Sequence, residues 1–365
     1  MGSLRGFWGR LDASLAGRLF LWILSRLYAV VQILWTRLGV LAGARPKSVA
    51  APVISVGNLT MGGTGKTSVV SYLATRLLER GFHVAVLSRG YKGGDEARML
   101  KEKFEVFGSR FRVLVGKNRH QSAAFFLSGA RRSAPGGVFI LDDGHQHRTL
   151  VKDFSIVLID ASDPVGLRGM TPYGFLREPL ACGLKRADLV ILTHADFSDA
   201  ATVDSLEALT RRTCAGISIF RGVHRPLGFR LLAPRAGPFQ EPGFFNGRKA
   251  ALVSGIGNPA SFERTMARLG ARILAHEVKD DHAVFTASEI GRILGRAKQA
   301  GAEAVATTAK DAVRLAGFLS VIDKDNGNVF LPWYALEVEF AFLEGEDRFW
   351  NEIEPLWKKF DAATA

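Results

Sequence analysis

The feature that most constrains this chain is a glycine-rich stretch, ISVGNLTMGGTGKTSVV, at residues 54–70. The run APVISVG, which overlaps its start, is short and β-branched, as is typical of a buried strand. After the glycines, KTSVVSYLATRLLERG carries apolar residues at helical spacing and stops at Gly81. A strand, a glycine loop and a helix in this order can cradle a phosphate, because backbone amides and the positive end of the helix dipole favour an anion.

The loop departs from the standard phosphate-loop pattern, Gly-x-x-x-x-Gly-Lys-Ser/Thr. Counting back from Gly65 puts Thr60 at the first glycine position, and the other glycines stand at 57, 62 and 63. We still expect the loop amides to face the phosphates of ATP, Lys66 to reach the β- and γ-phosphates, and Thr67 to hold Mg²⁺. The predicted ATP-binding residues are Gly62, Gly63, Thr64, Gly65, Lys66 and Thr67.

A second apolar run, GGVFILDDGHQH, ends in two carboxylates, Asp142 and Asp143. An apolar strand followed by Asp is the Walker-B arrangement, in which a carboxylate holds the metal ion. The predicted metal ligands are therefore Thr67, Asp142 and Asp143, and the pattern leaves open which Asp binds the ion directly.

Strand patterns alternate with helical patterns along the rest of the chain, at SIVLIDA, DLVILTHAD, AALVSGIG and AVATTAKD. This alternation predicts an α/β fold with a P-loop NTPase-type, doubly wound, mostly parallel sheet. Ligands on such sheets lie at the carboxyl ends of the strands, where the polar motifs of this chain stand. At 365 residues and 47% hydrophobic, the chain is long enough for two domains rather than one.

Cysteine and charge content narrow the class of protein further. The two cysteines, Cys182 and Cys214, lie far apart, which excludes a disulfide framework or a Cys-based zinc site and suits a reducing compartment. The net charge of +13 predicts an anionic partner. Nucleic acid is not expected, because the chain holds no dense Lys/Arg run with interleaved aromatic residues.

Nearly half of the excess positive charge lies in the first 50 residues, which carry seven basic side chains and one acid, Asp12. There the stretch LFLWILSRLYAVVQILWTRLGVLAGA is apolar but is interrupted by Arg26 and Arg37. On a helix, these two arginines and Arg18 fall within roughly a third of the circumference. Residues 1–44 therefore predict a basic apolar helix on an anionic membrane surface, with a buried core helix and a spanning helix as alternatives. On such a helix we expect three aromatic side chains to lie at the level of the lipid headgroups: Trp22, Tyr28 and Trp35.

A set of motifs extends along the chain from about residue 50 to about residue 315: SVGNLTMGGTGKT, SRGY, GDEA, LDDGHQH, LREP, GIGNPASF, DDHAVFT and TAKDAVRL. Their identity and order resemble the tetraacyldisaccharide 4′-kinase family of lipid A biosynthesis. The resemblance implies transfer of the ATP γ-phosphoryl group to the 4′-hydroxyl of an acylated glucosamine disaccharide 1-phosphate, at the cytoplasmic face of the bacterial inner membrane. It also implies two α/β domains, the smaller one completing a cleft with the P-loop domain.

The resemblance also assigns roles to residues. In that family the Asp of the GDE motif pairs with a His of the second domain, which here are Asp95 and His282. Asp95 would accept the proton of the attacking hydroxyl, and His282 would orient it or share the proton. The other residues at family active-cleft positions are Glu96, Arg119, Gln146, His147, Arg177 and Glu178. Of these, Arg119 or Arg177 would neutralise a phosphate.

We expect four segments: the membrane-surface helix at 1–44, a P-loop kinase domain at 45–222, a second α/β domain at 223–345, and a C-terminal helix at 346–365. No obligate protein partner is expected. The chain departs from the family pattern at four places. The interval before Asp95 is shorter, and GDEA stands where GDEP is commoner. Ser68 stands where proline is common, and His145 stands at a position that is usually apolar. The short interval leaves the exact position of the base open.

Two other classes compete with the kinase interpretation. A membrane-associated P-loop ATPase switch, whose ATP state controls partner binding, also uses a GG-x-GKT loop, but typically with lysine before the glycine pair, where this chain has Met61. A GTP-dependent metal-insertion or transport factor is disfavoured, because the sequence has no Cys/His cluster and no Asn-Lys-x-Asp motif. The number and order of the motifs favour the kinase.

Overall fold

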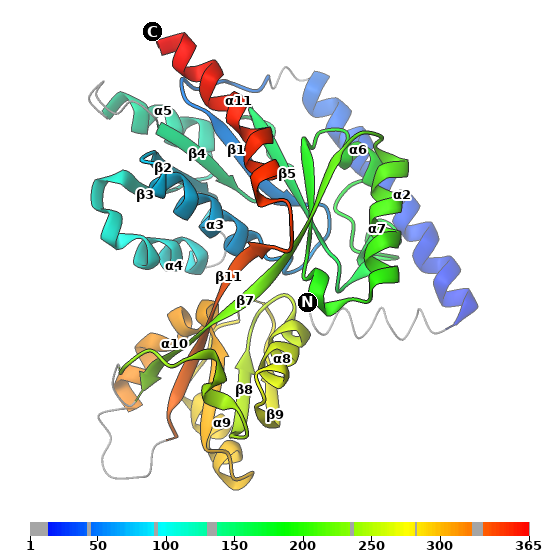
Figure 1. The fold of residues 1–365 in the computed structure, drawn as a ribbon. Helices are drawn as coiled ribbons and strands as arrows, with labels where there is room; N and C mark the ends of the chain where they lie inside the picture. The colour runs from blue at the N-terminus through cyan, green and yellow to red at the C-terminus, as the bar shows by residue number, and fades with distance from the viewer. Residues whose placement is uncertain are drawn as a thin grey trace. The chain divides into compact units, whose positions relative to one another are not determined.

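The computed structural model describes residues 14–41, 45–90, 94–129, 137–233, 237–281, 283–322 and 331–364. The chain divides into two compact units (Figure 1). The P-loop unit contains Ser3–Tyr91, Leu100–Val223 and Phe340–Ala365, and the second unit contains Lys92–Met99 and His224–Glu339.

The P-loop unit is built on a parallel sheet. Its strands are β1 (Val53–Asn58), β2 (His83–Ser88), β3 (Phe111–Val115), β4 (Gly137–Asp142), β5 (Phe154–Asp160), β6 (Leu189–Thr193) and the start of β7 (Ser218–Ala233). They lie in the order β3-β2-β4-β1-β5-β6-β7, and each pair of neighbours is parallel. All residues of β1 and β6 are buried, as expected for central strands covered on both faces. The predicted doubly wound α/β fold is confirmed.

Helices connect and cover these strands. They are α3 (Lys66–Glu79), α5 (Arg119–Gly129), α6 (Leu180–Leu184), α7 (Ala200–Thr213) and α11 (Glu346–Thr364), while α4 (Asp95–Lys103) begins in the second unit and ends in this one. Alternate residues of β4 face opposite sides, so Phe139 and Leu141 pack with Ala123 of α5. The last helix, α11, packs on α3: the Tyr72 hydroxyl donates to Glu346 Oε1 at 2.6 Å and accepts from Trp350 Nε1 at 3.0 Å.

The second unit has a smaller parallel sheet. Its strands β8 (Lys249–Ser254), β9 (Arg272–Val278), β10 (Ala304–Thr308) and β11 (Trp333–Phe342) lie in the order β11-β10-β8-β9. Its helices are α8 (Pro259–Arg268), α9 (Ala287–Gln299) and α10 (Ala309–Ile322). A capping box between Thr286 and Glu289 begins α9. Strands β7 and β11 each begin in one unit and end in the other.

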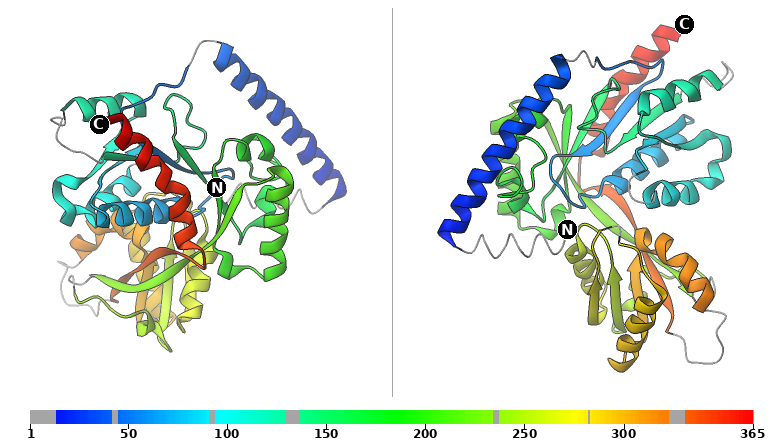
Figure 2. Two further views of the ribbon diagram at one scale, coloured as in Figure 1. Left: turned by 45° about the horizontal axis from the view of Figure 1, so that its top comes forward. Right: turned by 180° about the vertical axis from the view of Figure 1, so that it is seen from behind.

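The N-terminal helix α2 (Leu15–Leu41) lies on the outside of the P-loop unit (Figures 1 and 2). Leu21 and Ser25 are buried, and Tyr28 packs against the core cluster that includes Leu206 of α7. The segment Leu15–Leu34 is long and apolar enough to cross a membrane by length and composition. Most of its apolar surface is exposed, at Leu15, Leu19, Phe20, Trp22, Ile23, Leu27, Val30, Val31, Ile33 and Leu34. A helix of this kind is not an ordinary buried core helix.

Candidate functional site

The glycine loop lies between the end of β1 at Asn58 and the start of α3 at Lys66. Gly62 and Gly65 have φ values of 128° and 79°, a region that residues with a side chain rarely adopt. Gly65 is the N-cap of α3 and has no side chain to accept from the first-turn amides, so these amides can face an anion. The Thr193 hydroxyl at the end of β6 donates to the Thr64 carbonyl at 3.0 Å and holds the loop against the sheet.

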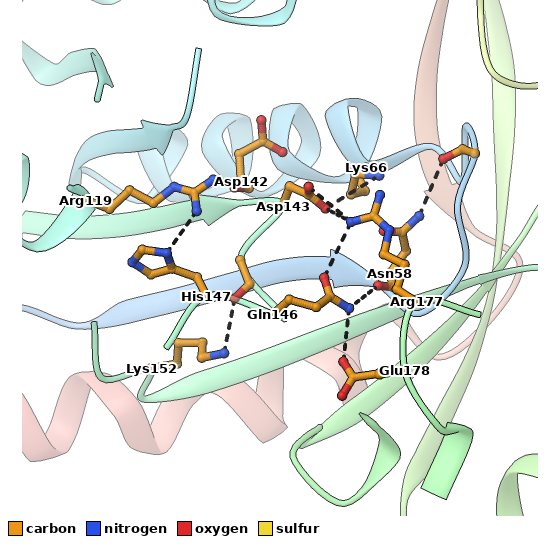
Figure 3. A network of polar contacts seen from close by, with 12 residues as sticks. Asn58, Lys66, Arg119, Asp142, Asp143, Gln146, His147, Lys152, Arg177 and Glu178 are labelled. Carbon is orange, nitrogen blue, oxygen red and sulfur yellow. Dashed lines mark hydrogen bonds and ion pairs between the residues drawn. The ribbon is translucent and has the colours of Figure 1, made fainter. Parts of the chain in front are cut away.

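The two aspartates after β4 take different positions (Figure 3). Asp142 ends the strand and is buried. Asp143 has a φ of 47°, an uncommon left-handed conformation, and its carboxylate lies 3.8 Å from Lys66 Nζ and 2.9 Å from Arg177 Nη1. Burial by itself would raise the pKa of Asp143, but the charges of Lys66 and Arg177 bring that pKa below its usual value. Asp143 is therefore ionised at neutral pH.

Gln146 connects the loop after β4 to β1 and to the LREP motif (Figure 3). Its side-chain amide donates to the Asn58 carbonyl at 2.9 Å and to Glu178 Oε1 at 3.1 Å. Arg177 lies 3.5 Å from Gln146 Oε1, and Arg186 donates to both carboxylate oxygens of Glu178 at 2.7 Å. Three segments that are distant in the chain thus share one hydrogen-bond network at the carboxyl end of the sheet.

Arg119 and His147 form the other side of this network. Arg119 is buried, donates to the Asp142 carbonyl at 3.0 Å, and lies 3.1 Å from His147 Nδ1. Burial, together with the charge of Arg119, lowers the pKa of His147 to about 4. His147 is therefore neutral at physiological pH and accepts at Nδ1, while its Nε2 lies 2.9 Å from the Thr149 hydroxyl.

The structure brings together eight predicted site residues of the P-loop unit: Lys66, Arg119, Asp142, Asp143, Gln146, His147, Arg177 and Glu178. Asp95 and Glu96 form the first turn of α4 and belong to the second unit. There Asp95 pairs with Arg314 and Glu96 with Lys310. His282 lies outside the described residues.

Sequence reasoning missed several members of these networks. Lys152 donates to the carbonyls of Gly144 and His145 at 3.1 and 2.8 Å and so supports the turn after the two aspartates. Burial and the charge of Arg186 lower the pKa of Lys152 to about 8. Neither basic residue stands in a recognisable pattern. Asn58, by contrast, could have been found from the sequence, because it precedes the glycine loop within the motif quoted above. Its side chain lies 3.5 Å from the Gly62 carbonyl.

Gly57, which lies before the first position of the standard loop pattern, makes room for the turn after the aspartates. A Cβ at this position would lie 2.5 Å from the Cβ and 2.7 Å from the backbone nitrogen of His145. The adjacent Gly144 amide donates to the Val56 carbonyl at 3.0 Å, which holds the turn against β1. Gly57 therefore contributes to packing between two motifs rather than to the phosphate loop.

Gly57→Ala is expected to destabilise the protein by about 1–3 kcal/mol, because overpacking must push the turn that carries Gln146 and His147 away from β1. Urea unfolding measures the loss. Gly137→Ala is the matched control, since a Cβ there meets no atom within 4 Å. Equal stability of the two variants would contradict this role for Gly57.

His145 fills a buried position that the resemblance leads us to expect to be apolar. Its ring lies 3.2 Å from the Ser155 hydroxyl and 3.0 Å from the Gly183 carbonyl, so both nitrogens have partners while the ring is neutral. Burial, and then the charge of Arg186, lower the pKa of His145 from 6.5 to about 4. The hydrogen bonds explain how a polar ring is accommodated there.

This depressed pKa predicts a pH-dependent stability. The unfolded chain takes up the proton first as the pH falls, so the contribution of His145 is complete above about pH 6.5 and is lost toward pH 4. Between pH 7 and pH 5 the free energy of unfolding should fall by about 2 kcal/mol through this residue. His145→Leu should be less stable at pH 7 but should lose less stability on acidification, in urea titrations at both pH values. An unchanged difference between pH 7 and pH 5 would show that His145 does not titrate in this way.

The donors near the loop fit Mg²⁺. Thr67 and the two aspartates offer hard oxygen ligands, which this ion prefers, and Mg²⁺ commonly takes only one or two carboxylates and completes its shell with substrate phosphates and water. In the part of the chain that the structure describes, no group of three or more His, Cys, Asp or Glu is placed to enclose a metal.

A parallel sheet with a glycine loop, two carboxylates and cationic side chains at the carboxyl ends of its strands defines the class of P-loop nucleotide-binding proteins. More particularly, the chain belongs to the tetraacyldisaccharide-1-P 4′-kinase (LpxK) family, whose sequence profile matches residues 17–357. The resemblance inferred from the motifs is confirmed.

Individual proteins to which the chain is similar carry the same family name. The tetraacyldisaccharide 4′-kinase of Anaeromyxobacter dehalogenans (strain 2CP-C) is 35% identical over 330 residues, covering 85% of this chain and 82% of the relative. That of Geobacter sulfurreducens is 34% identical over 371 residues, covering 94% and 96%. Among solved structures, LpxK from Aquifex aeolicus in complex with ATP is similar with a TM-score of 0.64 and 26% identity, over 93% of this chain and 99% of that one.

Proposed function

We propose that this chain transfers the γ-phosphoryl group of ATP to the 4′-hydroxyl of an acylated glucosamine disaccharide 1-phosphate. The observation that carries the proposal is the convergence of Lys66 and Arg177 on Asp143 beside the glycine loop, in a member of this kinase family. Two cations beside one ionised carboxylate form a site that can bind both phosphate and a divalent cation.

In the P-loop unit, the loop amides and Lys66 hold the β- and γ-phosphates, and Arg177 neutralises charge on the transferred group. Arg177 is held by Asp143 and Gln146, so its guanidinium is oriented before substrate binds. Thr67 and one or both of Asp142 and Asp143 would hold Mg²⁺. When bound, this ion supplies charge neutralisation on the phosphate oxygens.

The second unit supplies the proton acceptor. The 4′-oxygen attacks the γ-phosphorus, the bond from that phosphorus to the β,γ-bridging oxygen breaks, and ADP leaves with the bond's electron pair. Asp95 accepts the hydroxyl proton, and His282 orients Asp95 or shares that proton. His147 is neutral and so adds no charge beside the phosphates.

The test is incubation with [γ-³²P]ATP, Mg²⁺ and acylated disaccharide 1-phosphate in mixed micelles. We expect label in a lipid product that carries a second phosphate, and no transfer to the same lipid already phosphorylated at the 4′ position. Release of labelled inorganic phosphate without labelled lipid would contradict the kinase and favour the ATPase switch.

We further propose that the enzyme works at the cytoplasmic face of the bacterial inner membrane, with α2 on the anionic surface. The exposed apolar side chains of α2 stand beside basic residues such as Arg18 and Arg26, the pattern of an interfacial helix.

Replacing Leu19, Leu27 and Val31 together by Glu should weaken binding to phosphatidylglycerol-containing vesicles by on the order of tenfold or more, because each apolar side chain leaves the acyl boundary. Vesicle sedimentation gives the affinity. Val106→Glu is the control, an exposed apolar residue elsewhere in the P-loop unit. Unchanged sedimentation of the triple variant would contradict the assignment of α2 to the membrane surface.

A further inference from the structure

The first two turns of α10 carry two cations that reach the segments on which the proposed chemistry depends. Arg314 stands four positions after Lys310, so the two side chains lie on one face of the helix. Both belong to the TAKDAVRL motif, to which the proposed function assigns no role. Their side chains are 19% and 8% exposed, so each is largely withdrawn from water.

Arg314 makes four contacts within the second unit. Its Nε lies 3.2 Å from Asp95 Oδ2, its Nη1 donates to the Ala283 carbonyl at 3.2 Å, and its Nη2 donates to the Gly255 carbonyl at 2.9 Å. The same Nη2 lies 2.8 Å from Asp311 Oδ1. Ala283 directly follows His282 in the chain. One guanidinium thus joins the residue proposed as the base to the backbone next to its proposed partner.

Lys310 makes a parallel connection one turn earlier. Its Nζ lies 3.0 Å from Glu96 Oε1 and 3.2 Å from Asp281 Oδ1. Glu96 directly follows Asp95, and Asp281 directly precedes His282. Burial by itself would lower the pKa of Lys310, but Glu96 and Asp281 bring it above its usual value, so the ammonium is charged.

Asp311 anchors the arrangement. It is fully buried, and its Oδ2 accepts from the Gly255 amide at 3.0 Å and from the Thr308 hydroxyl at 2.7 Å. A Cβ on Gly255 would come within 3.1 Å of Arg314 Nη1 and 3.2 Å of Asp311 Oδ1, so glycine leaves room for the ion pair. A fixed carboxylate holds the guanidinium, and the guanidinium in turn holds Asp95.

We propose that Arg314 and Lys310 form a cationic clamp that positions Asp95, and with it the backbone at Asp281 and Ala283, for phosphoryl transfer. This inference rests on the proposed function, in which Asp95 is the proton acceptor. The clamp residues are positioning residues and contact no substrate in this scheme. Their effect is to hold two segments, distant in the chain, in one geometry, and catalytic rates are sensitive to displacements of about 1 Å.

The test is a double-mutant cycle on turnover with Arg314→Met, Asp95→Asn and the double variant. Arg314→Met should lower kcat by on the order of 10²-fold and change the KM for ATP by less than about threefold. In the Asp95→Asn background, Arg314→Met should lower kcat by less than about threefold, because the clamp then has no base to position. A residue with only a structural role would cost the same factor in both backgrounds.

Arg296→Met is the matched control, an arginine of the same unit that pairs with Glu277 at 3.4 Å and is 66% exposed, and it should leave kcat unchanged. Lys310→Met should behave like Arg314→Met with a smaller loss. If Arg314→Met does not fold by circular dichroism, Arg314→Lys enters the same cycle, since it keeps a charge beside Asp311.

The outcomes separate the two proposals. Suppose that Asp95→Asn is impaired. If Arg314→Met then keeps the wild-type kcat, or if it lowers kcat by the same factor in the wild-type and Asp95→Asn backgrounds, the clamp is overturned and the base assignment stands. Wild-type turnover in Asp95→Asn would overturn the base assignment and the clamp with it.

Discussion

Lys66→Ala is expected to reduce phosphoryl transfer by on the order of 10³-fold, because the γ-phosphate loses the cation that neutralises its developing charge. Lys66 begins α3 and its Nζ lies 3.8 Å from Asp143 Oδ1, so its side chain already points to the carboxylate side of the loop. Transfer of label from [γ-³²P]ATP to the acylated disaccharide gives the rate. Arg212→Ala, an exposed cation on α7, is the control for a simple change of net charge.

The same substitution should leave the fold intact, since the ammonium is not part of the core. It should also raise the pKa of Asp143, because Lys66 is the first of the charges that keep that pKa low. Near-normal transfer by Lys66→Ala would show that the glycine loop does not hold the reacting phosphate.

Asp95→Asn is expected to lower kcat by about 10²–10⁴-fold while the KM for ATP changes little, because a positioned general base contributes in that range and the predicted ATP-binding residues belong to the other unit. His282→Ala should act in the same direction. Steady-state kinetics at saturating lipid measure both constants. Glu102→Gln, on the exposed side of α4, controls for loss of a carboxylate from this helix.

A change confined to KM in Asp95→Asn would mean that Asp95 binds substrate and does not accept a proton. Together with the Lys66 variant, this measurement separates loss of phosphate binding from loss of proton transfer.

The sequence was sufficient for the architecture. Strand, glycine loop and helix at residues 53–79, and the apolar strand that ends at Asp142, follow from local periodicity and from glycine positions. Such signals are contained within a few consecutive residues, so no knowledge of distant contacts is required. The class of protein and the family follow from these motifs and their order.

The resemblance also pointed to side chains that the structure brings together. Arg119 or Arg177 was expected to neutralise a phosphate, and in the structure the Arg177 guanidinium lies 2.9 Å from Asp143 Oδ1 and 3.5 Å from Gln146 Oε1. The left-handed conformation of Asp143, whose carboxylate lies near both Lys66 and Arg177, has no signal in the sequence.

By itself, then, the sequence determined the fold class and the family, and it located the glycine loop and the pair of aspartates after β4. Only the tertiary structure decided that Gly57 lies against His145, which partners the buried His145 ring has, and that Lys310 and Arg314 contact residues on either side of position 282 as well as Glu96 and Asp95. The physical reason is that an ion pair or a close contact depends on which side chains meet in space. In this chain those side chains come from segments that no local pattern connects.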